Sequence, residues 1–320
     1  MSYMNFPFPI QPEYTGISLA YTNSRLIADE VSPRVAVGAR EFKWFQMNRT
    51  DRFTIPDTLV GRKSAPNQVE FGGIEQSGFV KDRALDDVVP QEDIDSAYQG
   101  YDPLGQAIEG ITELLALDRE KRVADQYFSS STYPAANRTT LSGTSQWSDY
   151  ANSDPYRAMM TAMDGMLIRP NYVVFGRLGW NIFRVHPKIT AAVVPSATGN
   201  TGTSNAQGAP ASLQAVADLL EVDRILVGEA WYNSAKPGQT PVMTRLWGKH
   251  CALLHQRPLG SLRGNGITFG ATAQYGTRVA GTLENPFLGM RGSIQCRAGE
   301  SVQELIIAND VGYFFQDCVA

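Results

Sequence analysis

Apolar residues recur at helical spacing in the stretch that begins with Asp102-Pro103. Aspartate before proline is a favourable helix start, because the carboxylate accepts free backbone N–H groups and proline fits the first helical position. The apolar positions that follow are three and four residues apart: Leu104, Ala107, Ile108, Ile111, Leu114 and Leu115. Near the end, opposite charges stand four residues apart, Asp118 with Arg122 and Lys121 with Asp125. The pattern predicts one helix from Pro103 to Phe128, about 39 Å long at 1.5 Å per residue.

The residues between 154 and 262 alternate between helical and strand patterns. A second Asp-Pro start at Asp154 opens a helix with alanine and methionine on one face, which is typical of core packing. Shorter elements follow: a buried strand at 172–175, a helix at 178–185, a helix at 212–220 and a strand at 225–232. The stretch 195–210, rich in Gly, Ser and Thr, predicts an exposed loop. This alternation predicts a compact α+β lobe, and from Leu262 onward the pattern is that of successive strands.

The first 89 residues lack the apolar positions that a core of their own would need. In residues 1–36, Pro7, Pro9 and Pro12 disfavour helix and favour an extended arm, followed by a weak helical pattern at 17–31. In residues 37–89, strand-like runs near Phe42 and Phe53 are separated by glycines and prolines. This predicts a long two-stranded excursion, which is marginally stable alone in water and must lie against another surface.

Composition narrows the class of protein by exclusion. The 320 residues are 43% hydrophobic and 19% charged, an ordinary globular balance that excludes a disordered chain. A formal net charge of −4 argues against a protein that coats nucleic acid, since that class carries a basic surplus. The sequence has no apolar stretch near the roughly 18 residues of a membrane span, and residues 1–12 lack the pattern of a signal peptide. We therefore expect a soluble protein made in the cytoplasm.

Candidate chemical sites are few. Cys251, Cys296 and Cys318 are an odd number without a CxxC pair, which favours buried free thiols over a disulfide framework or a zinc site. His250 and His255 flank a predicted strand on opposite faces, so they do not converge on one metal ion. The sequence contains no recognisable phosphate-binding loop or nucleophile–base arrangement. We predict no catalytic, cofactor-binding or metal-binding residues.

The segment 82–102 is the most unusual charged stretch. Against one basic residue, Arg83, it carries seven carboxylates: Asp82, Asp86, Asp87, Glu92, Asp93, Asp95 and Asp102. Their spacing is irregular and lacks the glycine of a calcium loop, which favours a solvated or partner-facing surface over paired catalytic carboxylates. Residues 41–63 have a basic bias. Opposite biases on neighbouring segments suggest complementary contacts between copies of the chain.

Three stretches carry a resemblance to a known family. The first runs from Pro170 to Ile189 (PNYVVFG to HPKI), the second from Val227 to Gly248 (VGEAWYN to LWG) and the third from Phe269 to Tyr313 (FG, YGTRV and ELIIANDVGY). Together with the order of the elements, which covers nearly the whole chain, they resemble the major capsid proteins of tailed phages. The resemblance implies an α+β fold of the Hong Kong 97 type, which encapsulin nanocompartments share.

The resemblance also implies a division into domains. Residues 1–36 correspond to the N-terminal arm, 37–89 to the extended E-loop, 90–153 and 263–302 to the peripheral domain with its spine helix and long strands, and 154–262 and 303–320 to the axial domain. The loop 195–210 is then expected near a five- or six-fold axis. Some relatives carry a long N-terminal scaffolding segment, for which we expect this chain to be too short. Others crosslink an E-loop lysine; Lys63 and Lys81 lie in this region, but without a local motif we predict no crosslink.

The implied function is structural: a capsid subunit that self-assembles into hexamers and pentamers of an icosahedral phage head around double-stranded DNA. The implied partner is the chain itself, through the E-loop, the N-arm and the axial domain. Scaffold, portal and decoration proteins are further candidate partners, DNA is contacted only non-specifically, and no membrane is expected. The expected location is the virion. Two alternatives stay open: an encapsulin-like compartment shell, and a soluble enzyme with a site in segment 82–102.

Overall fold

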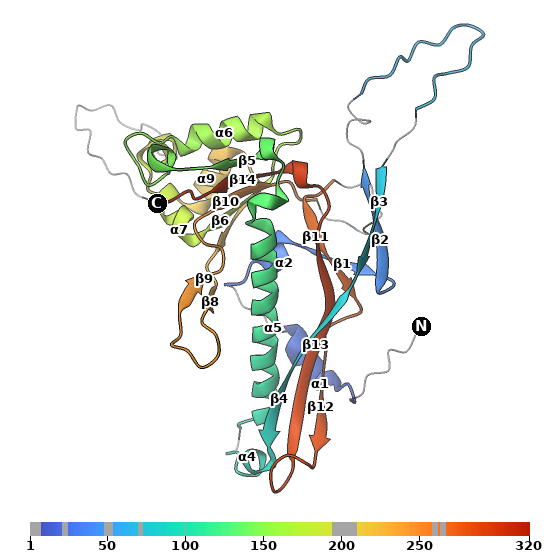
Figure 1. The fold of residues 1–320 in the computed structure, drawn as a ribbon, viewed down its shortest axis with the longest axis vertical. Coiled ribbons are helices and arrows are strands. Elements are labelled where there is room, and N and C mark those ends of the chain that lie inside the picture. Colours follow the sequence, from blue (N-terminus) through green and yellow to red (C-terminus); the bar gives the residue numbers. More distant parts are fainter. Residues whose placement is uncertain are drawn as a thin grey trace.

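The computed structural model describes residues 8–20, 25–47, 54–69, 73–98, 100–193, 210–257, 262 and 267–320. These residues form two five-stranded sheets, two separate hairpins and one 25-residue helix, arranged as Figure 1 shows. The expected mixture of helix and sheet is confirmed. The stretch 194–209, and with it nearly all of the predicted loop 195–210, lies outside the described residues.

The first sheet has the order β1-β11-β13-β12, with β4 on the free side of β13. Its longest strand is β13, which pairs antiparallel with β4 on one side and with β12 and β11 on the other. The strands are β1 (Arg34–Val37), β4 (Lys81–Pro90), β11 (Gly270–Tyr275), β12 (Val279–Asn285) and β13 (Ser293–Ile306). Because β4 is a strand of this sheet, the two-stranded excursion ends at Phe79 and not near residue 89.

The long helix α5 (Pro103–Tyr127), which the sequence predicted from Pro103 to Phe128, packs along this sheet. The Asp102 carboxylate accepts the Leu104 N–H at 3.1 Å and begins the helix. Ile108, Ile111 and Leu115 are buried against Val89 and the first sheet. Both expected ion pairs are present on the helix, Arg122 with Asp118 at 3.0 Å and Lys121 with Asp125 at 2.5 Å.

The second sheet has the order β5-β14-β10-β6-β7. The strands are β5 (Arg138–Thr140), β6 (Tyr172–Gly176), β7 (Arg224–Gly228), β10 (Cys251–Leu254) and β14 (Gly312–Gln316). Alternate residues of β6 point to opposite sides: Val173 and Phe175 join a core with the helices, and Val174 joins the core around the end of α5. The helices are α6 (Pro155–Gly165), α7 (Arg177–Phe183), α8 (Pro187–Val193) and α9 (Leu213–Leu220).

The methionines of α6 are core residues, as predicted. Met159 and Met163 are buried with Trp147 and Phe183. The three cysteines are free and buried, which confirms the prediction of buried free thiols. His250 and His255 do flank strand β10, and each ring is hydrogen bonded to a backbone group.

Two hairpins stand apart from the sheets in Figure 1. In the first, β2 (Glu41–Met47) pairs antiparallel with β3 (Gly73–Phe79). In the second, β8 (Trp231–Asn233) pairs with β9 (Met243–Arg245). The single strand predicted at 225–232 is therefore wrong, because β7 ends at Gly228. A Cβ on Gly228 would lie 2.1 Å from the Trp247 ring, so the chain packs closely against that indole and turns away.

The N-terminal region contains more helix than its prolines suggested. Pro12 is the first residue of α1 (Pro12–Ala20), a position where a missing N–H costs nothing. The helical pattern predicted at 17–31 corresponds to the end of α1 and the short α2 (Ala28–Val31), with residues 21–24 outside the described set. A third short helix, α4 (Gln91–Asp95), connects β4 to the approach to α5. The strand-like run near Phe53 is not a strand in its described part, Thr54 and Ile55.

Candidate interaction surfaces

Residues 54–69, the described part of the loop between β2 and β3, lie away from both sheets (Figure 1). All of these residues, which we call the hairpin tip, have exposed side chains. Ile55 is 92% and Leu59 is 84% exposed. The tip also carries Arg62 and Lys63. Large apolar side chains that a subunit leaves uncovered mark a surface for another protein.

The base of the hairpin packs against the main core. Phe42 and Trp44 have ring centroids 5.8 Å apart and are partly buried there. The expectation that the excursion must lie against another surface is therefore confirmed at these two aromatics. Phe79 is 51% exposed, so its side chain is less buried than those of Phe42 and Trp44. The unsupported part of the excursion is thus the tip, not the paired strands.

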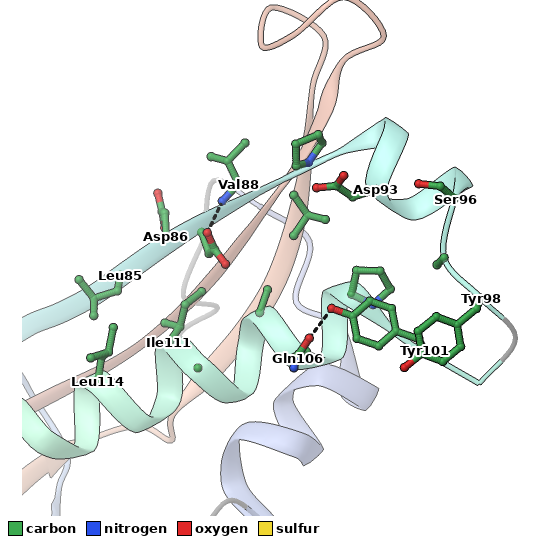
Figure 2. Close-up of a pocket in the computed structure, with 17 residues that line it drawn as sticks. Leu85, Asp86, Val88, Asp93, Ser96, Tyr98, Tyr101, Gln106, Ile111 and Leu114 are labelled. Atoms are coloured by element: carbon green, nitrogen blue, oxygen red, sulfur yellow. Dashed lines mark hydrogen bonds between the residues drawn. The ribbon is translucent and has the colours of Figure 1, made fainter.

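A groove of about 930 Å³ runs between β4, α4 and the first half of α5 (Figure 2). At one end Leu85 and Leu114 face each other, and both are exposed. At the other end the rings of Tyr98 and Tyr101 stack with centroids 5.3 Å apart. Seventeen residues line the groove, and most are apolar or aromatic. The arrangement fits an extended apolar segment rather than a small polar substrate.

The acidic segment borders this groove but is partly neutralised within the subunit. Asp86 pairs with Arg297 at 2.5 Å, and the hydrogen bond from Arg297 lowers the pKa of the Asp86 carboxyl. Asp82 lies 3.0 Å from Arg40, and Asp102 caps α5. Asp87 and Asp93 line the groove itself. The predicted acidic surface is exposed, and its lining part adds negative charge to the groove.

Asp86 in the segment 82–102 does not have the electrostatics of a general acid. A general acid needs a carboxyl whose pKa is raised, whereas the hydrogen bond from Arg297 lowers the pKa of Asp86. Within the part of the chain that the structure describes, no group of three or more His, Cys, Asp or Glu side chains could hold a metal ion. Among those same residues, no helix has the length and apolar character needed to cross a bilayer.

A third exposed surface lies at the turn between β12 and β13. Phe287 is 91% and Met290 is 99% exposed. The turn adjoins the end of β4, since Gln91 N–H donates to Gly292 O at 3.2 Å. Sequence reasoning missed this turn, although an unpatterned Phe and Met between glycines was the available signal.

Comparison with known proteins shows what the chain as a whole is similar to. A family model described as phage capsid protein matches residues 79–289. The chain is 46% identical over 316 residues to the major capsid protein of Pseudomonas phage JBD67, which covers 99% of each chain. A phage-related protein from Bordetella bronchiseptica RB50 has a similar structure, with a TM-score of 0.74, 20% identity and 98% of each chain covered. The capsid of cyanophage P-SCSP1u matches with a TM-score of 0.57 and 9% identity, over 99% of this chain and 93% of that one.

Proposed function

This chain belongs to the phage capsid protein family, and we propose that it builds the shell by inserting the hairpin tip of one copy into the groove of the next. As a phage major capsid protein it is a structural component of the virion. The compartment-shell alternative is not favoured, because the relative that matches 99% of the chain is a capsid protein. The enzyme alternative gains no support from Asp86 in the groove, because the hydrogen bond from Arg297 lowers the pKa of this carboxyl, which is the opposite of the shift that a general acid needs.

The proposal includes the finer architecture. Hexamers and pentamers of this subunit would close an icosahedral head around double-stranded DNA. The division into N-arm (1–36), E-loop (37–89), peripheral domain (90–153, 263–302) and axial domain (154–262, 303–320) is the framework. The two sheets support the peripheral and axial parts of this division, since one contains the long strands beside α5 and the other contains the strands of the α+β lobe. Because β4 pairs with β13, the projecting part of the E-loop ends at Phe79.

The single observation that carries the tip-to-groove contact is the exposed apolar hairpin tip. Burying about 400 Å² of it would contribute about 10 kcal/mol at ~25 cal/mol per Å². Fixing each backbone residue costs about 1–2 kcal/mol, so ordering about five residues of the tip already offsets half or more of this gain. One contact is therefore weak, and a closed shell is stable because the contact is repeated.

Opposite charges on the tip and in the groove favour one orientation of the contact. The tip carries Arg62 and Lys63, and the groove is lined by Asp87 and Asp93. Exposed ion pairs contribute only about 0–1 kcal/mol each, but like charges placed together suppress the wrong register. We expect these four residues to select how the tip enters the groove.

Charge reversal tests this contact. We expect R62E/K63E and D87K/D93K each to reduce the yield of closed particles in electron micrographs, and the combined four-residue variant to restore it. Lys236 is exposed on the other hairpin, so K236E is the matched control and should assemble normally. Assembly of the wild type should weaken at 1 M salt, where the Debye length is about 3 Å, more than assembly of R62E/K63E does.

Two outcomes would contradict the proposal at different levels. Wild-type protein that stays a monomer under all assembly conditions would overturn the shell-forming function. Single reversals that assemble like the wild type, or a combined variant no better than either parent, would overturn only the tip-to-groove contact.

A further inference from the structure

The segment 27–35, which we call the strap, runs between the two sheets and is bonded to both. On the side of the first sheet, Ser32 Oγ lies 2.9 Å from Thr272 Oγ1, and Arg34 donates to Glu300 Oε2 at 2.7 Å. On the side of the second sheet, Arg224 of β7 lies 2.9 Å from Glu30. Gln256, just after β10, donates to the carbonyl oxygen of Val31. The strap therefore bridges the two halves of the subunit.

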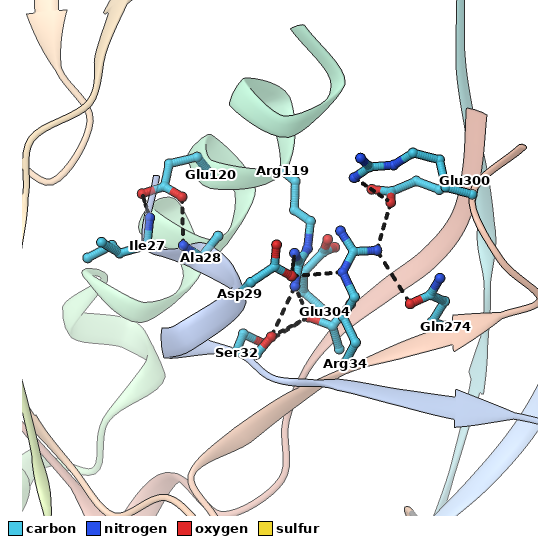
Figure 3. A network of polar contacts seen from close by, with 12 residues as sticks. Ile27, Ala28, Asp29, Ser32, Arg34, Arg119, Glu120, Gln274, Glu300 and Glu304 are labelled. Carbon is cyan, nitrogen blue, oxygen red and sulfur yellow. Dashed lines mark hydrogen bonds and ion pairs between the residues drawn. The ribbon is translucent and has the colours of Figure 1, made fainter. Parts of the chain in front are cut away.

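Two consecutive residues of α5 hold the strap at both ends of α2 (Figure 3). The Glu120 carboxylate accepts the N–H groups of Ile27 at 3.0 Å and Ala28 at 2.7 Å. The Arg119 guanidinium donates to the Ser32 carbonyl oxygen at 3.0 Å and pairs with Asp29. These contacts satisfy backbone groups that a four-residue helix leaves unpaired.

Glu120 also connects the strap to the second sheet. Its Oε1 accepts the indole N–H of Trp247 at 2.6 Å, in addition to the Ile27 N–H. Trp247 in turn lies against Gly228 at the end of β7. One carboxylate thus joins the strap, α5 and the turn that follows β9.

The strap is held by a mixture of apolar burial and buried charge. Ile27, Val31 and Val35 are buried. Arg119 and Glu300 are buried as well, and a buried ion pair repays its desolvation only when all of its polar atoms are bonded. Arg119 Nε and Glu300 Oε1 are buried without a hydrogen-bond partner. These two unpaired buried atoms reduce the net free energy that the docked strap gains from its charged contacts.

We propose that the strap can detach reversibly from α5 and that Arg119 and Glu120 hold it when it is docked. We call the strap together with these two residues the latch. Docked, the strap fixes the angle between the two sheets; released, it lets them move independently. This inference concerns the single subunit and goes beyond the assembly proposed above. It gives the shell subunit a built-in means to change shape without unfolding either sheet.

Hydrogen exchange of the full-length free subunit tests the latch. In E120Q the amide nitrogen of the new side chain faces N–H donors, so we expect exchange in residues 27–35 to rise about tenfold or more. R119M should have a similar effect. W247F removes the indole N–H that donates to Glu120, so we expect exchange in residues 27–35 to rise several-fold. Exchange in β10 and β13 should stay unchanged. R122M is the matched control, because Arg122 lies on the same helix but contacts Asp118 and Glu304 instead of the strap.

Equal exchange of the strap in E120Q, R122M and the wild type would overturn the latch. An equal rise over the whole chain would overturn it too, because the change would then be global unfolding. Particle formation is scored separately in micrographs. Normal particles with unaltered strap exchange would count against the latch alone, whereas wild-type protein that forms no particles would count against the proposed function alone.

Discussion

The carboxylate of Glu300 on β13 lies between two guanidinium groups. Its Oε2 is 2.7 Å from Arg34 Nη1 and 3.3 Å from Arg278 Nη2. Burial acts to raise the pKa of this carboxyl, but the positive charges of Arg34 and Arg278 hold it below its ordinary value of 4.5. With a depressed pKa in the folded state, the ion pairs contribute stability above pH 4.5 that is lost as pH falls through the folded-state pKa.

E300Q should therefore destabilise the subunit at neutral pH and much less in acid. Removing one partner of a buried ion pair costs about 3–5 kcal/mol, which we expect as the difference in free energy of unfolding at pH 7. Urea unfolding of wild type and E300Q, repeated from pH 7 to pH 3, measures how that difference narrows. Glu284 is exposed on β12, so E284Q is the control and should show little difference at any pH. A difference that stays constant with pH would contradict this prediction.

Single residues were predictable where their partners are close in sequence. Asp102 and Asp154 were expected to begin helices, and each carboxylate does accept a nearby backbone N–H. The roles of Arg119 and Glu120 were not predicted, because their partners lie about 90 and more residues away. A local signal existed: Arg119 stands four residues after Leu115 and four before Val123, on the buried side of the helix.

At the scale of elements, two adjacent leucines of α5 have different roles, one in the core and one at the surface. Leu115 is 4% exposed and packs against the first sheet, whereas Leu114 is 57% exposed and lines the groove. Helical geometry places neighbouring residues about 100° apart, so one points to the core and the next to the surface. The same helix thus contributes to the fold and to the proposed assembly contact.

L115A and L114A should separate these two contributions. L115A leaves a cavity in the core, and we expect a loss of about 2–5 kcal/mol in the free energy of unfolding. L114A should change that free energy by less than about 0.5 kcal/mol and still reduce the yield of particles. Urea unfolding of free subunits and light scattering during assembly give the two readouts. If L114A assembles as the wild type does, the groove is not an assembly surface.

Elements with a local signal were predicted best. Helices α5 and α6 have their caps and apolar faces within their own sequence. Strand β4 was assigned to the excursion because its partner, β13, lies about 200 residues further along the chain. The groove depends on that pairing, so the acidic segment could be predicted as a surface but not as the wall of a groove.

At the scale of the whole molecule, the subunit is a body with a projecting tip. The order of elements was visible in the sequence, because each element has its own period or start signal. The relative placement of the sheets was not visible, since the polar contacts of the strap and of Trp247 that link the two sheets join segments far apart in the sequence. Those contacts leave no repeating pattern along the chain.

The hairpin tip should be ordered by assembly rather than by its own subunit. Local hydrogen bonds occur within 54–69, such as Ser64 N–H to Gly61 O at 3.1 Å and Asn67 Nδ2 to Asp57 O at 2.8 Å, and every side chain of this segment is exposed. Backbone amides with exposed, local bonds open readily, so exchange at 54–69 should be fast in free subunits. In shells, burial in a neighbouring groove should slow it by about tenfold or more, provided that the contact contributes at least ~1.4 kcal/mol.

A shortened chain gives the stricter test of the same prediction. Replacing 54–69 by a short Gly-Ser turn removes no buried side chain, since all of these residues are exposed, so the subunit should fold with an unchanged midpoint of urea unfolding. It should nevertheless form no stable closed particles, because the groove of each copy stays empty. The matched control replaces residues 235–241 of the β8–β9 loop by the same Gly-Ser turn, and we expect it to assemble normally. Stable closed shells from the shortened chain would show that the tip is not what joins the subunits.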